Sequence, residues 1–122
     1  MPDTLVRTIG FSSAAIVVIG TGVWLTRSGW PFGTVLLNTH KLIALAAVIF
    51  LGVLVYRAAN VAPLSATDWA VVVAAGLLCA ASFASGGVVS AIQSAPAWVS
   101  WVHRIGTWFA VGAVGLCLVR VI

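Results

Sequence analysis

The chain has 122 residues, of which 62% are hydrophobic and 7% are charged. Soluble domains carry roughly 25% charged residues, so this composition excludes a water-soluble domain and predicts an integral membrane protein in contact with the lipid bilayer. The formal net charge of +4 comes from single bases near the ends of apolar segments. Scattered bases indicate anchoring at the lipid interface and exclude a nucleic-acid partner.

Four apolar segments follow one another along the chain, each close to the ~20 residues that a membrane-spanning helix needs. They cover about residues 5–26, 35–57, 68–87 and 97–120. Turn-forming residues separate them, including Ser28-Gly29, Asn60 with Pro63, Gly86-Gly87 and Ser94-Ala95-Pro96. Because the connections are short, we predict one all-α domain over residues 1–122, an integral membrane up-down four-helix bundle.

The two acidic residues lie outside the middle of the predicted spans. Asp3 is in the N-terminal tail, and Asp68 begins the third segment, where Ser65-x-x-Asp68 resembles a helix capping box. Proton-coupled transport commonly uses a carboxylate buried in the membrane. The sequence therefore disfavours a small oligomeric transporter, which is kept as an alternative, and it disfavours catalysis by paired carboxylates.

His40 and His103 are the two histidines of the chain, and each lies about two turns into an apolar segment. Ionisable side chains inside lipid are costly and usually functional, so their matching positions predict one shared site. The first and third segments match poorly when His40 is laid on His103. The same alignment pairs positions of the second and fourth segments: Lys41 with Arg104, Arg57 with Arg120, and Gly33 with Pro96.

The expected topology gives this pair of histidines a geometry. The second and fourth spans run in the same direction and lie diagonally across the bundle. Neighbouring axes ~8–10 Å apart put diagonal axes about 11–14 Å apart, too far for direct contact of two imidazoles but suitable for imidazole, iron and imidazole. We therefore predict that His40 and His103 are the metal ligands of one b-type haem. The alternative is that both are merely hydrogen-bonded in the bundle.

Small and basic residues near the histidines fit a haem. Ala44, Gly106 and Thr107 share a helical face with the histidines and leave room for a macrocycle. Lys41, Arg104 and Arg27 are candidate partners of the haem propionates, with anchoring to lipid phosphates as the alternative. Other small residues would serve either the approach of the macrocycle or close helix packing: Gly20, Gly22, Gly76, Ser82, Ser85 and Gly86.

The distribution of arginines predicts an orientation. Arg7, Arg57 and Arg120 lie at the membrane face that carries the N-terminus. If Lys41 and Arg104 serve the haem, the positive-inside rule places this face in the cytoplasm. We therefore predict a bacterial inner-membrane protein with both termini in the cytoplasm and the haem toward the outer side.

Two segments resemble the haem-ligand helices of membrane b-type cytochromes: NTHKLIALAAVIFLGVLVYR, residues 38–57, and WVHRIGTWFAVGAVGLCLVR, residues 101–120. The whole chain looks like one four-helix half of haem A synthase, which implies His40 and His103 as axial ligands. That family places a catalytic Glu just ahead of a ligand histidine, whereas Leu37-Asn38-Thr39 and residues 99–102 precede the histidines here. Its extracellular loop often carries a Cys pair, and this loop has none. These departures imply haem binding without haem-modifying machinery.

The predicted function is electron transfer rather than catalysis, because two histidine ligands leave no open position on the iron. A quinol or a redox protein would be the electron partner. The alternative is a structural or assembly subunit of a larger membrane complex, and a homodimer is a further possible assembly.

Overall fold

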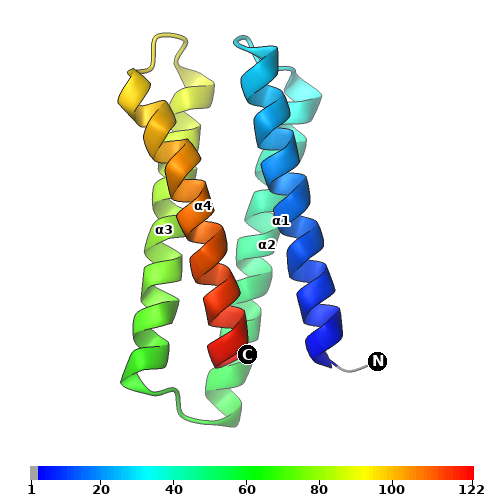
Figure 1. Cartoon of the computed structure of the whole chain (residues 1–122), viewed down its shortest axis with the longest axis vertical. Helices are drawn as coiled ribbons and strands as arrows, with labels where there is room; N and C mark the ends of the chain where they lie inside the picture. The colour runs from blue at the N-terminus through cyan, green and yellow to red at the C-terminus, as the bar shows by residue number, and fades with distance from the viewer. Residues whose placement is uncertain (1–2) are drawn as a thin grey trace. The chain divides into compact units, whose positions relative to one another are not determined.

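The computed structural model describes residues 3–122 as four α-helices joined by short loops (Figure 1). Within the described residues there is no strand. The structure therefore confirms the predicted all-α class with four helices. Residues 1–2 of the domain predicted over 1–122 lie outside the described residues. The helices are α1 (Asp3–Ser28), α2 (Thr34–Val61), α3 (Ala66–Ala91) and α4 (Ala97–Val121).

Each helix is long and apolar enough to cross a membrane. The shortest, α4, has 25 residues. A rise of ~1.5 Å per residue makes a helix of this length longer than the ~30 Å hydrocarbon core of a bilayer. All four helices also expose large apolar side chains, such as Ile16 at 70%, Val35 at 82% and Val119 at 84%. Soluble monomers rarely expose such continuous apolar surface, so the helices are those of a membrane protein.

All four helices run past their predicted ends, α2 and α3 by four residues each. α2 continues to Val61 rather than ending at Arg57, and the Asn60 side chain bonds the Tyr56 carbonyl at 2.9 Å within the helix. α3 passes through Gly86-Gly87 and ends at Ala91. Backbone groups in a membrane must be hydrogen-bonded within the segment, so a pair of glycines does not by itself end a helix there.

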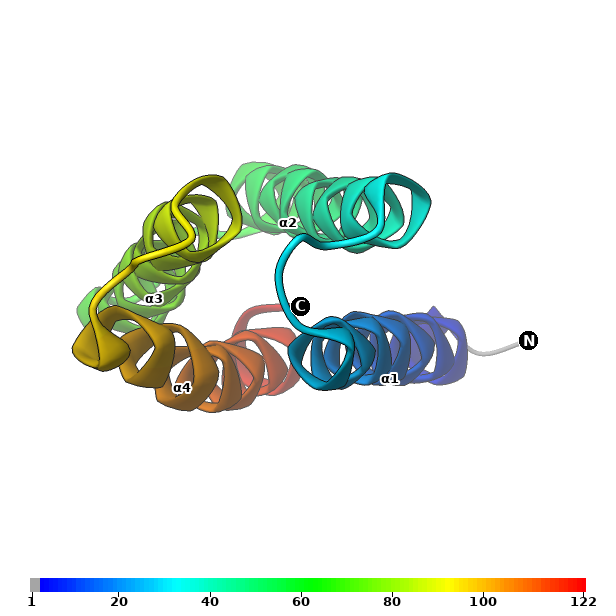
Figure 2. The ribbon, with the colours of Figure 1, turned by 90° about the horizontal axis from the view of Figure 1, so that it is seen from above.

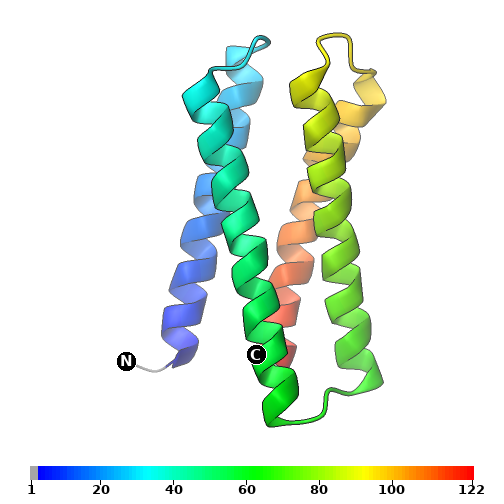
Figure 3. The same cartoon turned by 180° about the vertical axis from the view of Figure 1, so that it is seen from behind.

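The chain forms two compact units. The first ends at Phe50 and holds α1 with the first part of α2, and the second, Leu51–Ile122, holds the rest of α2 with α3 and α4. Within each unit, consecutive helices run in opposite directions, as the short loops predict (Figure 1). Figure 2 shows the loops 29–33 and 92–96 from above, and Figure 3 shows the loop 62–65 between α2 and α3.

α3 and α4 lie side by side in the second unit (Figures 1 and 3). Small side chains dominate their contact, and small residues let membrane helices approach closely. Cys117 is fully buried, and neither it nor Cys79 forms a disulfide. The buried residues of the two helices are Ala75, Cys79, Ser85, Val99, Ala110 and Cys117.

The predicted capping box at the start of α3 is confirmed. Ser65 Oγ accepts from the Asp68 main-chain N–H at 3.1 Å, and the Asp68 carboxylate accepts from the Ser65 N–H at 3.2 Å. The same carboxylate lies 3.6 Å from Nε of Arg120, at the end of α4. Asp68 therefore takes part in the hydrogen bonds that cap α3, and its ion pair with Arg120 links the start of α3 to the end of α4.

Candidate functional site

In the first unit, the Thr21 hydroxyl on α1 anchors His40 of α2. His40 Nδ1 lies 2.8 Å from Thr21 Oγ1. The hydroxyl hydrogen is directed at the main chain of its own helix, with Oγ1 2.7 Å from Val17 O. This arrangement allows the hydroxyl to accept from His40, with the imidazole hydrogen on Nδ1 and the lone pair on Nε2.

The His40 ring also lies against Gly22 on α1. A Cβ atom at position 22 would come 3.2 Å from His40 Cε1 and 3.8 Å from Nδ1. Side-chain atoms normally keep a wider separation than 3.2 Å. The absence of a side chain at Gly22 thus lets the half-buried ring sit close to the α1 backbone, within reach of Thr21.

In the second unit, the α3 main chain anchors His103 of α4. His103 Nδ1 lies 2.9 Å from the carbonyl oxygen of Ser82. A carbonyl can only accept a hydrogen bond, so Nδ1 is again the protonated nitrogen and Nε2 again carries the lone pair. Ser85 Oγ lies at 3.4 Å from the same Nδ1 and donates its own hydrogen to Ala81 O at 2.8 Å.

Gly86 occupies the place against His103 that Gly22 occupies against His40. A Cβ atom at position 86 would lie 2.7 Å from His103 Cε1 and 3.0 Å from Nδ1. The ring therefore fills the space that any side chain at position 86 would need. Two of the small residues proposed to leave room, Gly22 and Gly86, face the histidine rings, whereas Gly20 and Gly76 have nothing within 4 Å of a Cβ position.

In both units a glycine lies against the histidine ring and a hydroxyl residue precedes that glycine, but the hydroxyl oxygen is 2.8 Å from Nδ1 at His40 and 3.4 Å from Nδ1 at His103. The pairs are Thr21-Gly22 and Ser85-Gly86. They are one residue out of register when His40 is laid on His103, because α1 is one residue longer than α3 between its glycine and the following loop. An alignment that allowed this shift would have found them. The sequence did not single out Thr21, whose hydroxyl contacts His40.

The three predicted basic residues are exposed. Lys41 and Arg104 each follow a histidine, and Arg27 lies in the last turn of α1. None of the three forms a salt bridge within residues 3–122. Their pairing with haem propionates stays a prediction.

The predicted small neighbours are half-buried. The Thr107 hydroxyl donates to the His103 carbonyl at 2.6 Å, within α4. A Cβ at Gly106 would lie 3.7 Å from Ser82 Oγ, so Gly106 faces α3. Ser82 Oγ is buried and has no hydrogen-bond partner within the described residues. Ala44 lies on the first unit's part of α2, and the room that these residues would leave for a macrocycle stays a prediction.

The donor set suits a haem iron. Histidines that bind metals usually donate their other ring N–H to a carbonyl or similar acceptor, which fixes the tautomer, and both Nδ1 atoms are held in this way. Within residues 3–122 no three side chains of the His, Cys, Asp and Glu types come together. A zinc ion needs three or four protein ligands, whereas a haem needs one or two because its porphyrin supplies the others. His40 and His103 belong to different units, and their diagonal separation stays a prediction.

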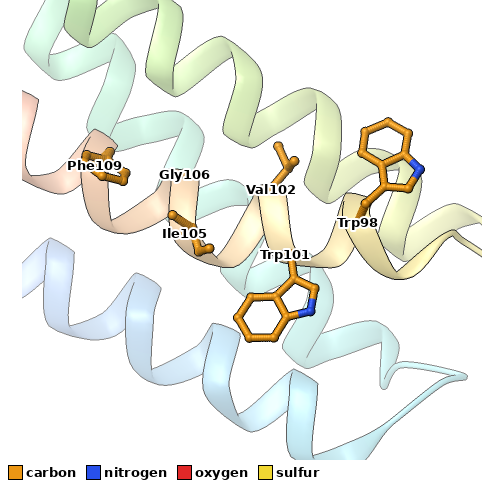
Figure 4. Close-up of a pocket in the computed structure, with 6 residues that line it drawn as sticks. All are labelled: Trp98, Trp101, Val102, Ile105, Gly106 and Phe109. Carbon is orange, nitrogen blue, oxygen red and sulfur yellow. The ribbon is translucent and has the colours of Figure 1, made fainter.

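A shallow apolar hollow of about 500 Å³ lies on one face of α4 (Figure 4). Ligand sites combine apolar walls with a few polar groups that fix orientation, and His103 does not line this hollow. The hollow therefore adds nothing to the histidine site. Its lining consists of Trp98, Trp101, Val102, Ile105, Gly106 and Phe109.

No family model, curated protein or solved structure matches this chain. The resemblance of residues 38–57 and 101–120 to one half of haem A synthase therefore stays a prediction. The function is inferred from the geometry around the two histidines.

Proposed function

We propose that this protein is a membrane b-type cytochrome that carries electrons on one haem, with His40 and His103 as axial ligands. The supporting observation is the hydrogen bond at each Nδ1, 2.8 Å to Thr21 Oγ1 and 2.9 Å to Ser82 O. Both bonds leave the lone pair on Nε2, as a metal ligand requires. Two ligands of one iron would each need this anchoring.

Connectivity supports placing both ligands at one depth. In a chain that crosses the membrane four times with short loops, the second and fourth spans run in the same direction. His40 follows the start of α2 at Thr34 by the same distance as His103 follows the start of α4 at Ala97. Diagonal spans about 11–14 Å apart would leave room for a porphyrin between the two imidazoles.

Each part of the chain would have a defined task. A bound haem supplies one-electron exchange at its iron. His40 and His103 would hold the iron and leave it no open position, which favours electron transfer over oxygen chemistry. Thr21 and the Ser82 carbonyl orient the ligands, and the apolar helices exclude water. A quinol or a redox protein would deliver or receive the electron.

The proposal extends to the exposed bases and to orientation. Lys41, Arg104 and Arg27 lie toward the loops 29–33 and 92–96, as partners of two propionates at a polar interface would. Assigning these bases to the haem leaves Arg7, Arg57 and Arg120 to set the topology. The positive-inside rule then favours cytoplasmic termini in a bacterial inner membrane.

The absorption spectrum of the full chain, expressed with haem available and purified in detergent, tests this function. We expect a Soret band and a sharp α band on reduction. Thr39→Ala is the matched control, because Thr39 neighbours His40 but bonds Val35 O of its own helix at 2.7 Å. His40→Ala and His103→Ala are each expected to lose the six-coordinate spectrum. A colourless wild-type protein contradicts the proposal, and an unchanged spectrum in both alanine variants contradicts the ligand assignment.

A further inference from the structure

We infer that the two histidines are anchored unequally, and that the Thr21 hydroxyl is a positioning residue that fixes the tautomer and ring plane of His40. Among the described residues no hydroxyl has the corresponding role for His103, since the Ser85 hydroxyl lies 3.4 Å from its Nδ1. The effect on a bound haem rests on the proposed function. The effect on the imidazole itself does not, because it can be measured in the protein without haem.

The inequality follows from the chemistry of the two acceptors. At His40 the acceptor is a side-chain oxygen, Thr21 Oγ1, at 2.8 Å. At His103 the near acceptor is the main-chain oxygen of Ser82 at 2.9 Å, and the Ser85 hydroxyl is at 3.4 Å. N–H···O bonds cluster near ~2.9–3.0 Å and weaken beyond that distance. A substitution can remove the Thr21 oxygen, but none removes the Ser82 carbonyl.

Thr21 is itself held in position to accept. Its Oγ1 lies 2.7 Å from Val17 O and 3.1 Å from Val18 O, so the hydroxyl donates its hydrogen to the main chain of α1. Threonine is β-branched, so its χ1 angle has few alternatives in a helix. The hydroxyl oxygen therefore has few alternative positions, and it lies 2.8 Å from His40 Nδ1. A hydroxyl that donates to a carbonyl is also polarised into a better acceptor.

Gly22 completes this anchor. A Cβ at position 22 would lie 3.2 Å from His40 Cε1, so a side chain there would push the ring away from α1 and from Thr21. The anchor of His40 is thus the pair Thr21-Gly22, with one residue supplying the acceptor and the next supplying the space. A ring held in this way presents Nε2 in one direction and, through its Nδ1 bond, is a stronger metal donor.

The test compares Thr21→Val with Thr21→Ser in the full chain. Valine keeps the branched shape and removes the oxygen, whereas serine keeps the oxygen. Nitrogen NMR of the two ¹⁵N-labelled histidines, in detergent and without haem, reports which ring nitrogen carries the hydrogen. We expect Thr21→Val to lose the Nδ1–H form at His40 only and Thr21→Ser to retain it. Ser85→Ala is expected to leave the tautomer of His103 unchanged. Thr26→Ala removes a hydroxyl that bonds Gly22 O at 3.0 Å, and it is expected to leave the tautomers of both histidines unchanged.

With haem supplied, the same variants give a second readout. We expect Thr21→Val to bind haem roughly 10-fold more weakly, the lower end of the range for loss of a partner of a metal-binding histidine. The ratio of ferrous to ferric protein at a fixed potential should also rise, because a weaker donor stabilises the ferric state less. Thr21→Ser should restore both, and Ser85→Ala should change neither.

The possible results separate the two proposals. An unchanged His40 tautomer in Thr21→Val overturns the positioning role of Thr21, and so does an equal change at His103 in Ser85→Ala. Failure of Thr21→Ser to restore the tautomer also overturns it. A chain that shows the expected tautomer change but takes up no haem supports the anchoring role and contradicts the cytochrome function.

Discussion

His103 lies so close to Gly86 that a Cβ atom at position 86 would approach its Cε1 atom to 2.7 Å. Real side chains do not tolerate this separation, so either the ring or the helix must move. The ring is held by the bond from Nδ1 to Ser82 O at 2.9 Å. A side chain at position 86 therefore has to break this bond or part α3 from α4.

Gly86→Ala is expected to lower the stability of the second unit by about 1–3 kcal/mol, as overpacking does, and to release haem. Gly87→Ala is the matched control, because nothing lies within 4 Å of a Cβ at position 87. Thermal loss of helical circular dichroism and haem content per chain measure the two effects. Equal losses in the two variants would contradict the close contact of Gly86 with His103.

The capping box predicts a smaller, local effect. Ser65→Ala removes the side chain that accepts from the Asp68 N–H at 3.1 Å. Loss of an N-cap side chain destabilises by about 1 kcal/mol. Unfolding in mixed micelles of increasing denaturing detergent measures the change. The exposed Ser94, in the loop 92–96, supplies the control Ser94→Ala, and a Ser65→Ala variant as stable as this control would argue against the cap.

Packing between α3 and α4 predicts a position-dependent response to larger side chains. Cys117 is fully buried, whereas Val119 on the same helix is 84% exposed. Cys117→Leu is expected to destabilise by about 1–3 kcal/mol through overpacking, and Val119→Leu is expected to have little effect. The same unfolding assay compares them. Comparable stability of the two variants would show that Cys117 does not lie in a tight contact.

Much of the fold could be predicted from the sequence because lipid leaves few alternatives. Apolar segments of spanning length must be helices, since their backbone groups have no water to bond, and the breaks at Ser28-Gly29 and Pro96 carry turn chemistry. The capping box at Ser65 and Asp68 was also predictable because it is local. The ends of α2 and α3 could not be predicted. Asn60 and Gly86-Gly87 can remain helical in a membrane, because other backbone conformations would leave polar groups without hydrogen bonds.

The site was less predictable, because it depends on which faces of neighbouring helices meet. His40 and His103 stand out in an apolar sequence, but Thr21 is one of several threonines and serines in α1. Only the rotation of α1 against α2 brings its hydroxyl to 2.8 Å from His40 Nδ1. For the same reason, the sequence did not show that Gly22 and Gly86, rather than Gly20 and Gly76, face the imidazoles.

The proposed orientation predicts where the C-terminus lies. Ile122 follows Arg120, at the membrane face that we propose to be cytoplasmic. A C-terminal fusion to a reporter that is active only in the cytoplasm should be active. Activity of a fusion that works only outside the cytoplasm would reverse the orientation. The matched fusion in the loop 92–96 should behave in the opposite way.

The most direct test of the central claim is electron paramagnetic resonance of the oxidised protein, purified with haem available and quantified for iron per chain. Two imidazoles on one iron give a low-spin ferric signal, and we predict this signal at one haem per chain. His40→Ala and His103→Ala should each convert it to a high-spin signal or abolish it. A protein without haem iron would contradict the claim that His40 and His103 ligate one haem. A low-spin signal that persists in His40→Ala or in His103→Ala would also contradict it.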